Sequence, residues 1–269
     1  MTRMSVNEAA KKAEYPLFIP FIMAGDPDPS TTIELVLRME EAGAHIVELG
    51  IPYSDPLADG PVLQRSAKRA LQQGMSLMRA MQLVPEMRKR GLTIPVIIFT
   101  YYNPVFQMGV KTFLDKVKEN EADGVLIPDL PYEESQELTV TAKENGLANI
   151  SLVAPTSSTR IEKIANKAEG FLYCVSSLGV TGTRESFSEE AYTFIKNVNL
   201  SSKVPVAVGF GISKPEHVEN LQGVCNGVIV GSAIMKKVEE RLSEFSQEEK
   251  MKQNALQEIK SFVSSLISS

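Results

Sequence analysis

Histidine and cysteine are scarce in this sequence, with two of each among 269 residues. Cys174 and Cys225 show no CxxC spacing, so neither a disulfide framework nor a zinc site is indicated, and both are expected to be small buried hydrophobes. His45 precedes an apolar run and His217 lies in a polar, helix-like stretch, so both are expected to be structural or solvated. A catalytic triad based on histidine, a Cys–His dyad and a His-ligated metal are therefore not expected.

Long apolar runs and an excess of positive charge are also missing. No run reaches the ~18 apolar residues of a membrane helix, and the amino terminus lacks a signal-peptide core, so a cytoplasmic protein is expected. A net charge of −5 provides no basic surface for nucleic acid or for an anionic membrane. Hydrophobic residues make up 43% of the chain, and no linker or charge block interrupts it, which favours a single domain over residues 1–269.

Strand-like and helix-like runs alternate along the chain. Eight apolar, β-branched runs are predicted strands, at 17–24, 45–50, 94–101, 124–129, 150–155, 170–176, 204–210 and 227–231. Amphipathic helices are predicted at 31–42, 77–90, 110–120, 133–145, 161–168, 189–197 and 215–221, and an extra helix at 5–13 precedes the first strand. Strands without polar alternation are typical of a parallel sheet that is covered on both faces. Eight strand–helix units in this length predict an α/β fold, a single-domain (β/α)8 TIM barrel, with a doubly wound sheet as the competing architecture.

The stretch 47–60 carries two carboxylates in different settings. Glu48 interrupts a predicted strand and should point into the space that the sheet encloses. Asp59 ends a loop that three prolines stiffen. Barrel enzymes hold their chemistry at the carboxyl ends of the strands, and no lysine lies at such an end to form a Schiff base. Glu48 and Asp59 are therefore a candidate acid/base pair, and the alternative is a structural glutamate and a solvated aspartate.

Glycine-rich turns close the last two predicted strands, at 209–211 and at Gly231-Ser232. The loops after strands seven and eight form the usual phosphate site of barrel enzymes. Gly211 lets the backbone approach the phosphate oxygens, and Ser232 begins a predicted short helix, 232–237, whose positive dipole end faces an anion. Such glycines also occur for steric reasons alone, and a phosphate here could belong to a sugar phosphate or to a flavin.

The loop 177–187, after the sixth strand, is long and rich in small residues. Gly179 and Gly182 provide hinges, so the loop is expected to act as a lid that excludes water. A flexible connection without function is the alternative.

The run 47–60 resembles the signature of the tryptophan synthase α-subunit family, which reads aliphatic-Glu-aliphatic-Gly, two residues, an aromatic, then Ser-Asp-Pro-Leu-Ala-Asp-Gly. The resemblance extends over the chain, through Phe21, Gly25-Asp26-Pro27, Tyr101, Asn103, Pro128-Asp129-Leu130-Pro131, Gly179-Val180-Thr181-Gly182, Gly211 and Gly231-Ser232. It implies cleavage of indole-3-glycerol phosphate to indole and glyceraldehyde 3-phosphate. It also implies transfer of the indole to a pyridoxal-phosphate-dependent β subunit in an α2β2 complex, with no cofactor or metal in this chain. Ser177 departs from those members that carry a basic residue there, which leaves open how the lid closes.

This reaction gives the candidate residues roles. Glu48 suits a proton shuttle, Asp59 suits the indole N–H group, and Tyr173 could support Glu48 or the ring tautomer. The expected substrate-binding residues are Phe21, Tyr101, Asp129, Thr181 and Phe210, and the expected phosphate-binding residues are Gly182, Gly211, Gly231 and Ser232.

Several other functions stay open at this stage. A phosphosugar isomerase barrel would share the phosphate site but would not explain the Asp59 loop. The chain could also be a stand-alone indole-3-glycerol-phosphate lyase, a flavin-dependent barrel oxidoreductase or a non-catalytic barrel that activates a partner. The apolar residues Phe106 and Met108 follow the third strand and favour docking of a β subunit on the carboxyl face of the barrel.

Overall fold

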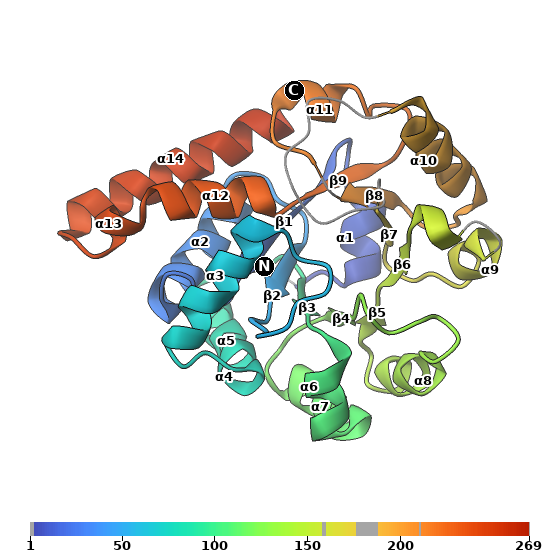
Figure 1. The fold of residues 1–269 in the computed structure, drawn as a ribbon, viewed down its shortest axis with the longest axis horizontal. Helices are drawn as coiled ribbons and strands as arrows, with labels where there is room; N and C mark the ends of the chain where they lie inside the picture. Colours follow the sequence, from blue (N-terminus) through green and yellow to red (C-terminus); the bar gives the residue numbers. More distant parts are fainter. Residues whose placement is uncertain (1–2, 158–159, 176–187, 210, 269) are drawn as a thin grey trace.

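A computed structural model describes residues 3–157, 160–175, 188–209 and 211–268, and in these residues nine parallel strands form a barrel with helices around it (Figure 1). The strands are β1 Leu17–Met23, β2 Val47–Gly50, β3 Val96–Phe99, β4 Gly124–Leu126, β5 Ala148–Asn149, β6 Ser151–Val153, β7 Leu172–Val175, β8 Val206–Gly209 and β9 Gly227–Val230. Their order in the sheet is β5-β4-β3-β2-β1-β9-β8-β7-β6. The first strand therefore pairs with the last, which confirms the predicted barrel and excludes the doubly wound sheet.

The barrel closes through β5 and β6. The predicted fifth strand, 150–155, contains β6, whereas β5 lies just before its predicted start. β5 pairs with β4, β6 pairs with β7, and Ile150 between them donates its N–H to the carbonyl oxygen of Val125 at 2.9 Å. Because one continuous segment joins both edges of the sheet, no edge stays open there. The predicted count of eight units is confirmed, with one strand broken at Ile150.

The helices follow the strands as expected, with several differences in detail. They are α1 Val6–Lys12, α2 Pro29–Glu41, α3 Pro61–Gln72, α4 Leu77–Met81, α5 Leu83–Lys89, α6 Tyr102–Met108, α7 Val110–Glu119, α8 Gln136–Glu144, α9 Ile161–Ala165, α10 Glu189–Ser201, α11 Pro215–Glu219, α12 Ser232–Glu240, α13 Leu242–Phe245 and α14 Glu249–Ile267. The predicted helix 77–90 is divided at Gln82 into α4 and α5. None of the helices within the described ranges is long and apolar enough to cross a membrane.

Two segments that were predicted to be loops contain helical residues. Pro61 is the first residue of α3, so it starts a helix rather than stiffening the Asp59 loop. A proline suits this position because the first helical N–H group has no partner inside the helix. The segment 103–106 belongs to α6, whose N-cap residue is Tyr101.

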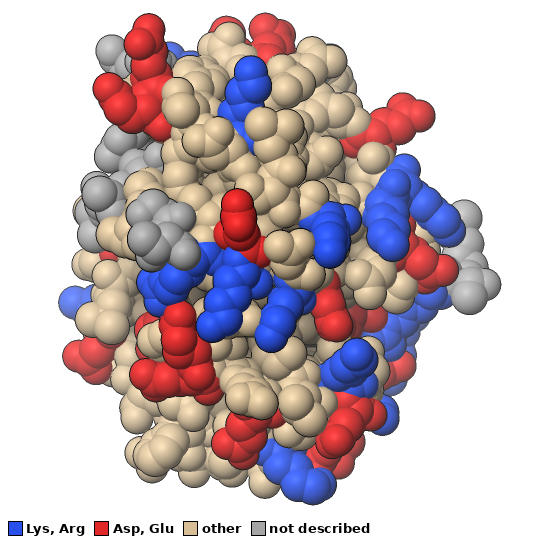
Figure 2. All heavy atoms as spheres, turned by 90° about the vertical axis from the view of Figure 1, so that its right-hand side faces the viewer, with Lys and Arg blue, Asp and Glu red and all other residues tan. Residues whose placement is uncertain are grey.

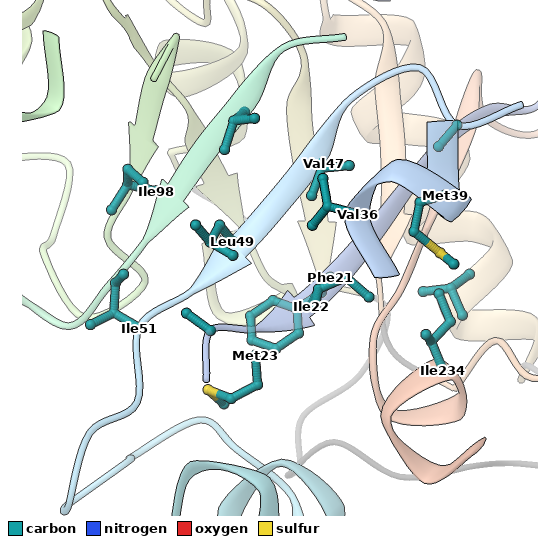
Figure 3. Close-up of a cluster of buried hydrophobic side chains, with 14 of the residues drawn as sticks. Phe21, Ile22, Met23, Val36, Met39, Val47, Leu49, Ile51, Ile98 and Ile234 are labelled. Carbon is teal, nitrogen blue, oxygen red and sulfur yellow. The ribbon is translucent and has the colours of Figure 1, made fainter. Parts of the chain in front are cut away.

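The core has an outer and an inner part. The outer part packs the helices on the sheet and on one another, for example Val36 of α2 near Val47 of β2, and Met39 of α2 near Ile234 of α12 (Figure 3). The inner part fills the barrel with side chains that alternate with these, including Ile19, Ile46, Ile97, Leu126 and Tyr173. The predicted extra helix, α1, joins the inner part through Val6, Ala9 and Ala10.

Candidate active site

Glu48 lies inside the barrel, as its position in the strand predicts. Its neighbours Val47 and Leu49 pack in the outer core, whereas Ile46, two residues earlier, packs in the inner core. The side chain is fully buried, and among the described residues neither carboxyl oxygen has a hydrogen-bond partner. Burial raises the pKa of Glu48 to about 8, so the group is largely protonated at neutral pH. A buried carboxyl group without a partner costs free energy, which makes Glu48 a candidate for a role in the site.

Tyr173 of β7 brings a hydroxyl group close to the candidate acids. Burial is the main cause that raises its pKa, and negative charge on Glu48 and on Asp59 raises it further. Tyr173 is therefore a neutral hydrogen-bond donor near both carboxyl groups. A Cβ atom at Gly209 of β8 would lie 2.3 Å from the Tyr173 hydroxyl oxygen, so a glycine there leaves room for this ring.

Asp59 is buried, so the alternative of a solvated loop aspartate is wrong. Only 7% of the residue is exposed, because Tyr101 holds the loop against the barrel. The Tyr101 hydroxyl accepts a hydrogen bond from the N–H group of Ala58, the residue before Asp59, at 3.1 Å. Burial raises the pKa of Asp59 to about 6, although its interaction with the Tyr101 hydroxyl opposes this shift. Asp59 is therefore mostly ionised at neutral pH.

Phe21 provides an apolar surface beside Glu48. The two residues are register partners, with Phe21 in β1 and Glu48 in β2. Its ring meets that of Phe99 edge to face, with 5.4 Å between the ring centroids. A Cβ atom at Gly50 would lie 2.1 Å from the Phe21 ring, so a glycine at this position leaves room for the ring. Phe99 was not among the predicted site residues, because nothing in the sequence of its strand distinguishes a phenylalanine that faces the site from one that packs in the core.

Asp129 makes a hydrogen bond within the protein and also lines a cavity, together with Pro131 and Tyr132. Its Oδ1 accepts a hydrogen bond from the Tyr102 N–H at 2.8 Å, at the start of α6. A carboxylate there stabilises the amino end of the helix. Binding of substrate by Asp129 stays a prediction, with this helix contact as its structural role.

The two glycine turns differ in backbone conformation, since Gly211 has a positive φ and Gly231 has φ −116°. Gly211 has φ +87°, which favours glycine, and Gly231 is the N-cap residue of α12, where Ser232 is the first helical residue. His217 is buried, and its Nδ1 lies 3.3 Å from the Ser213 nitrogen and 3.2 Å from the Gly211 carbonyl oxygen, so it supports this turn, as predicted for a structural histidine. Thr181, Gly182, Phe210 and the loop 177–187 lie outside the described residues.

The site therefore combines a neutral buried glutamate, an ionised aspartate and a turn suited to phosphate. Among the described residues, no group of three or more His, Cys, Asp and Glu side chains is placed to hold a metal ion. Comparison with known proteins separates the possible functions. A family model described as tryptophan synthase alpha chain matches residues 7–264.

The chain belongs to this family. A tryptophan synthase alpha chain from Geobacillus sp. (strain WCH70) is 56% identical over 93% of this chain and 95% of its own length. One from Halalkalibacterium halodurans is 55% identical over 99% of this chain and all of its own length (100%). A solved tryptophan synthase complex from Pyrococcus furiosus contains a chain with a TM-score of 0.83 and 37% identity, covering 94% of this chain and 98% of that one.

Membership of the tryptophan synthase alpha chain family confirms the resemblance and the predicted lyase function, the cleavage of indole-3-glycerol phosphate. The isomerase, the flavin-dependent oxidoreductase and the non-catalytic barrel are thereby set aside. The family comparisons assign no roles to individual residues. The roles proposed for them rest on the geometry of the site.

Proposed function

We propose that this chain cleaves indole-3-glycerol phosphate through a single proton shuttle at Glu48, with Asp59 holding the indole ring. The observation that carries this proposal is the burial of a protonated Glu48 beside Phe21 and within electrostatic reach of Tyr173, with no hydrogen-bond partner among the described residues. A carboxylic acid whose pKa lies close to the operating pH is suited both to give and to take a proton.

The shuttle balances within one turnover. Protonated Glu48 gives its proton to C3 of the indole ring. The carboxylate so formed takes the proton of the hydroxyl group next to C3 while the carbon–carbon bond breaks, which releases indole and glyceraldehyde 3-phosphate. The Asp59 carboxylate accepts a hydrogen bond from the ring N–H, and this bond strengthens as the ring becomes cationic.

The phosphate group is proposed to lie at the turn of Gly211, Gly231 and Ser232. The first N–H groups of α12 have no acceptor within the helix, and the positive end of the helix dipole favours an anion. No cofactor takes part in this chain, and pyridoxal phosphate belongs to the β partner. Two buried free thiols, Cys174 and Cys225, fit the reducing cytoplasm that we propose as its location.

A β subunit is the proposed partner. One solved relative is the tryptophan synthase a2b2 complex of Pyrococcus furiosus, whose title reports mutual activation of its parts. In this chain Leu57 is 78% exposed and Phe106 is 65% exposed, and both follow carboxyl ends of neighbouring strands. Asn103 donates to the Tyr53 hydroxyl at 3.1 Å and so ties their two segments together. Large apolar side chains exposed together indicate a docking surface.

An assay of both products tests the function. The purified chain is mixed with indole-3-glycerol phosphate, with and without a β subunit, and indole and glyceraldehyde 3-phosphate are measured separately. The two products should appear in equal amounts without added cofactor. Absence of cleavage under both conditions would refute the proposal, and equal rates under both would support a stand-alone lyase.

A further inference from the structure

Asp26 is a fully buried carboxylate just beyond the carboxyl end of β1. Arg69 of α3 binds it through two nitrogens, with Nε to Oδ1 at 2.8 Å and Nη2 to Oδ2 at 2.8 Å. A guanidinium that pairs with both oxygens of a carboxylate fixes the relative orientation of the two groups. This contact therefore sets how α3 sits on the barrel.

Arg69 reaches a second acid on another helix. Its Nη1 lies 2.8 Å from Oε1 of Glu239 in α12. Arg65, one turn earlier in α3, binds both carboxylate oxygens of Glu239, at 2.8 and 2.6 Å. These hydrogen bonds lower the pKa of Glu239 to about 2. Two arginines and two carboxylates thus form a network of ion pairs with no net charge, which runs from the end of β1 across α3 to α12. Helices α3 and α12 pack side by side (Figure 1).

Each of the two helices carries one end of the site. Only Gly60 separates Asp59 from the first residue of α3, and Gln64 of α3 donates to the Asp59 carbonyl oxygen at 2.8 Å. The amino end of α12 is the phosphate turn, with Ser232 as its first residue. The position of α3 relative to α12 therefore sets the distance between Asp59, which is proposed to bind the indole N–H, and the turn at Ser232, which is proposed to bind the phosphate.

We propose that Arg69 and Glu239 are positioning residues that keep Asp59 and the phosphate turn at the separation the substrate needs. The inference rests on the proposed function of these two groups. Neither residue touches the reacting atoms. Misplacement of a reacting group by about 1 Å costs up to about 100-fold in rate, so a small shift of α3 has a measurable effect.

The test compares two glutamates of one helix. Glu239→Gln removes the charge that binds α3, whereas Glu240→Gln removes a charge whose ion pair, among the described residues, is with Lys237 of the same helix at 2.9 Å. We expect Glu239→Gln to lower kcat for indole-3-glycerol phosphate by about tenfold. Its Kd for glyceraldehyde 3-phosphate, which engages the phosphate turn alone, should stay at the wild-type value. Glu240→Gln should match the wild type in both measurements.

Arg69→Lys gives a second comparison, since a single ammonium group cannot hold both oxygens of Asp26 and also reach Glu239. It should lower kcat in the same way, measured at a temperature where circular dichroism shows the variant folded. Equal kcat for Glu239→Gln and Glu240→Gln would overturn the inference. So would a parallel loss of kcat and of glyceraldehyde 3-phosphate affinity, which would indicate a general structural role. An inactive wild-type chain would instead refute the proposed function.

Discussion

Glu48 and Glu40 show two opposite uses of a glutamate in this fold. Glu40 of α2 accepts hydrogen bonds from the Thr93 hydroxyl and from the N–H groups of Thr93 and Ile94, at 2.6 to 3.1 Å. Glu48 is fully buried, with no such partner among the described residues. The first therefore stabilises the fold, whereas the second costs free energy that only function explains.

Replacing each by glutamine separates these roles. Glu48→Gln should lose about 100- to 10,000-fold in kcat, because glutamine cannot shuttle a proton, while substrate affinity stays within a few-fold. Glu40→Gln should keep its kcat and lose about 1 kcal/mol of unfolding free energy in urea titrations. A Glu48→Gln variant with most of its turnover intact would contradict the assigned role.

The pH dependence of kcat/KM follows from the two acids. Asp59 must be ionised to accept the indole N–H, and its pKa is about 6, so activity should fall as the pH drops below that value. Glu48 must be protonated to start the shuttle, and its pKa is about 8, so activity should also fall above that value. The profile from pH 5 to pH 9.5 should therefore be bell-shaped. A flat profile across this range would rule out the assignment.

The stability of the fold should depend on pH through Glu48 as well. Its folded-state pKa is raised, so its contribution is fully present below the unfolded value of 4.5 and is lost as the pH rises to about 8. Glu48→Gln should therefore be more stable than the wild type at pH 9, and this advantage should shrink toward pH 5. Chemical denaturation at both values measures the difference.

Residue patterns predicted the direction of Glu48 but not the surroundings of Asp59. Strand alternation fixes which side chains face the barrel, and Glu48 follows that rule. The burial of Asp59 depends on the Tyr101 hydroxyl, which comes from a segment about 40 residues away and leaves no local signal. Tyr101 was expected to line the site with its ring, and its contact with the loop emerged only from the fold.

At the scale of elements, helix α3 was missed although its pattern is present in the sequence. Its buried face consists of Leu63, Ser66, Ala67 and Ala70, at helical spacing, and Gln64, Arg65 and Lys68 are exposed on the other side. Only one large apolar side chain lies on the buried face, so the charged face carries most of the helical periodicity. The apolar strands were easier to recognise, and each was found to within a few residues.

Asp123 joins several elements, which makes it a test of element packing. It accepts hydrogen bonds from Arg88 of α5 at 2.7 Å, from the Val96 N–H of β3 at 2.8 Å and from Arg3 at 2.7 Å. Arg88 is itself mostly buried, so loss of its partner leaves an uncompensated charge. Asp123→Ala should therefore destabilise the protein by roughly 3 kcal/mol in urea titrations.

Asp115→Ala is the matched control, since its carboxylate pairs with the exposed Lys111 of the same helix at 3.0 Å. It should change the unfolding free energy by at most about 0.5 kcal/mol. Equal effects of the two substitutions would show that the buried network adds nothing beyond a surface pair.

At the scale of the whole molecule, the alternation of strands and helices in the sequence predicted the barrel better than it predicted the active site. Parallel strands covered on both faces leave few closed arrangements, and β1 pairing with β9 is one of them. Closure through the broken β5–β6 segment depends on register between distant strands, which a single sequence does not encode locally. Acidic and basic side chains both occur on the face in Figure 2, in keeping with the predicted lack of a purely basic surface.

Association with a β subunit is a property of the whole molecule, and two equally exposed leucines test where it occurs. Leu57, 78% exposed, follows the carboxyl end of β2, whereas Leu200, 77% exposed, lies in α10 ahead of β8. Because burial of apolar area drives docking, Leu57→Asp should weaken the complex by at least tenfold in Kd, as should Phe106→Asp, whereas Leu200→Asp should have no effect. Titration calorimetry with a β subunit measures all three. Equal weakening by Leu57→Asp and Leu200→Asp would mean that the carboxyl face is not the docking surface.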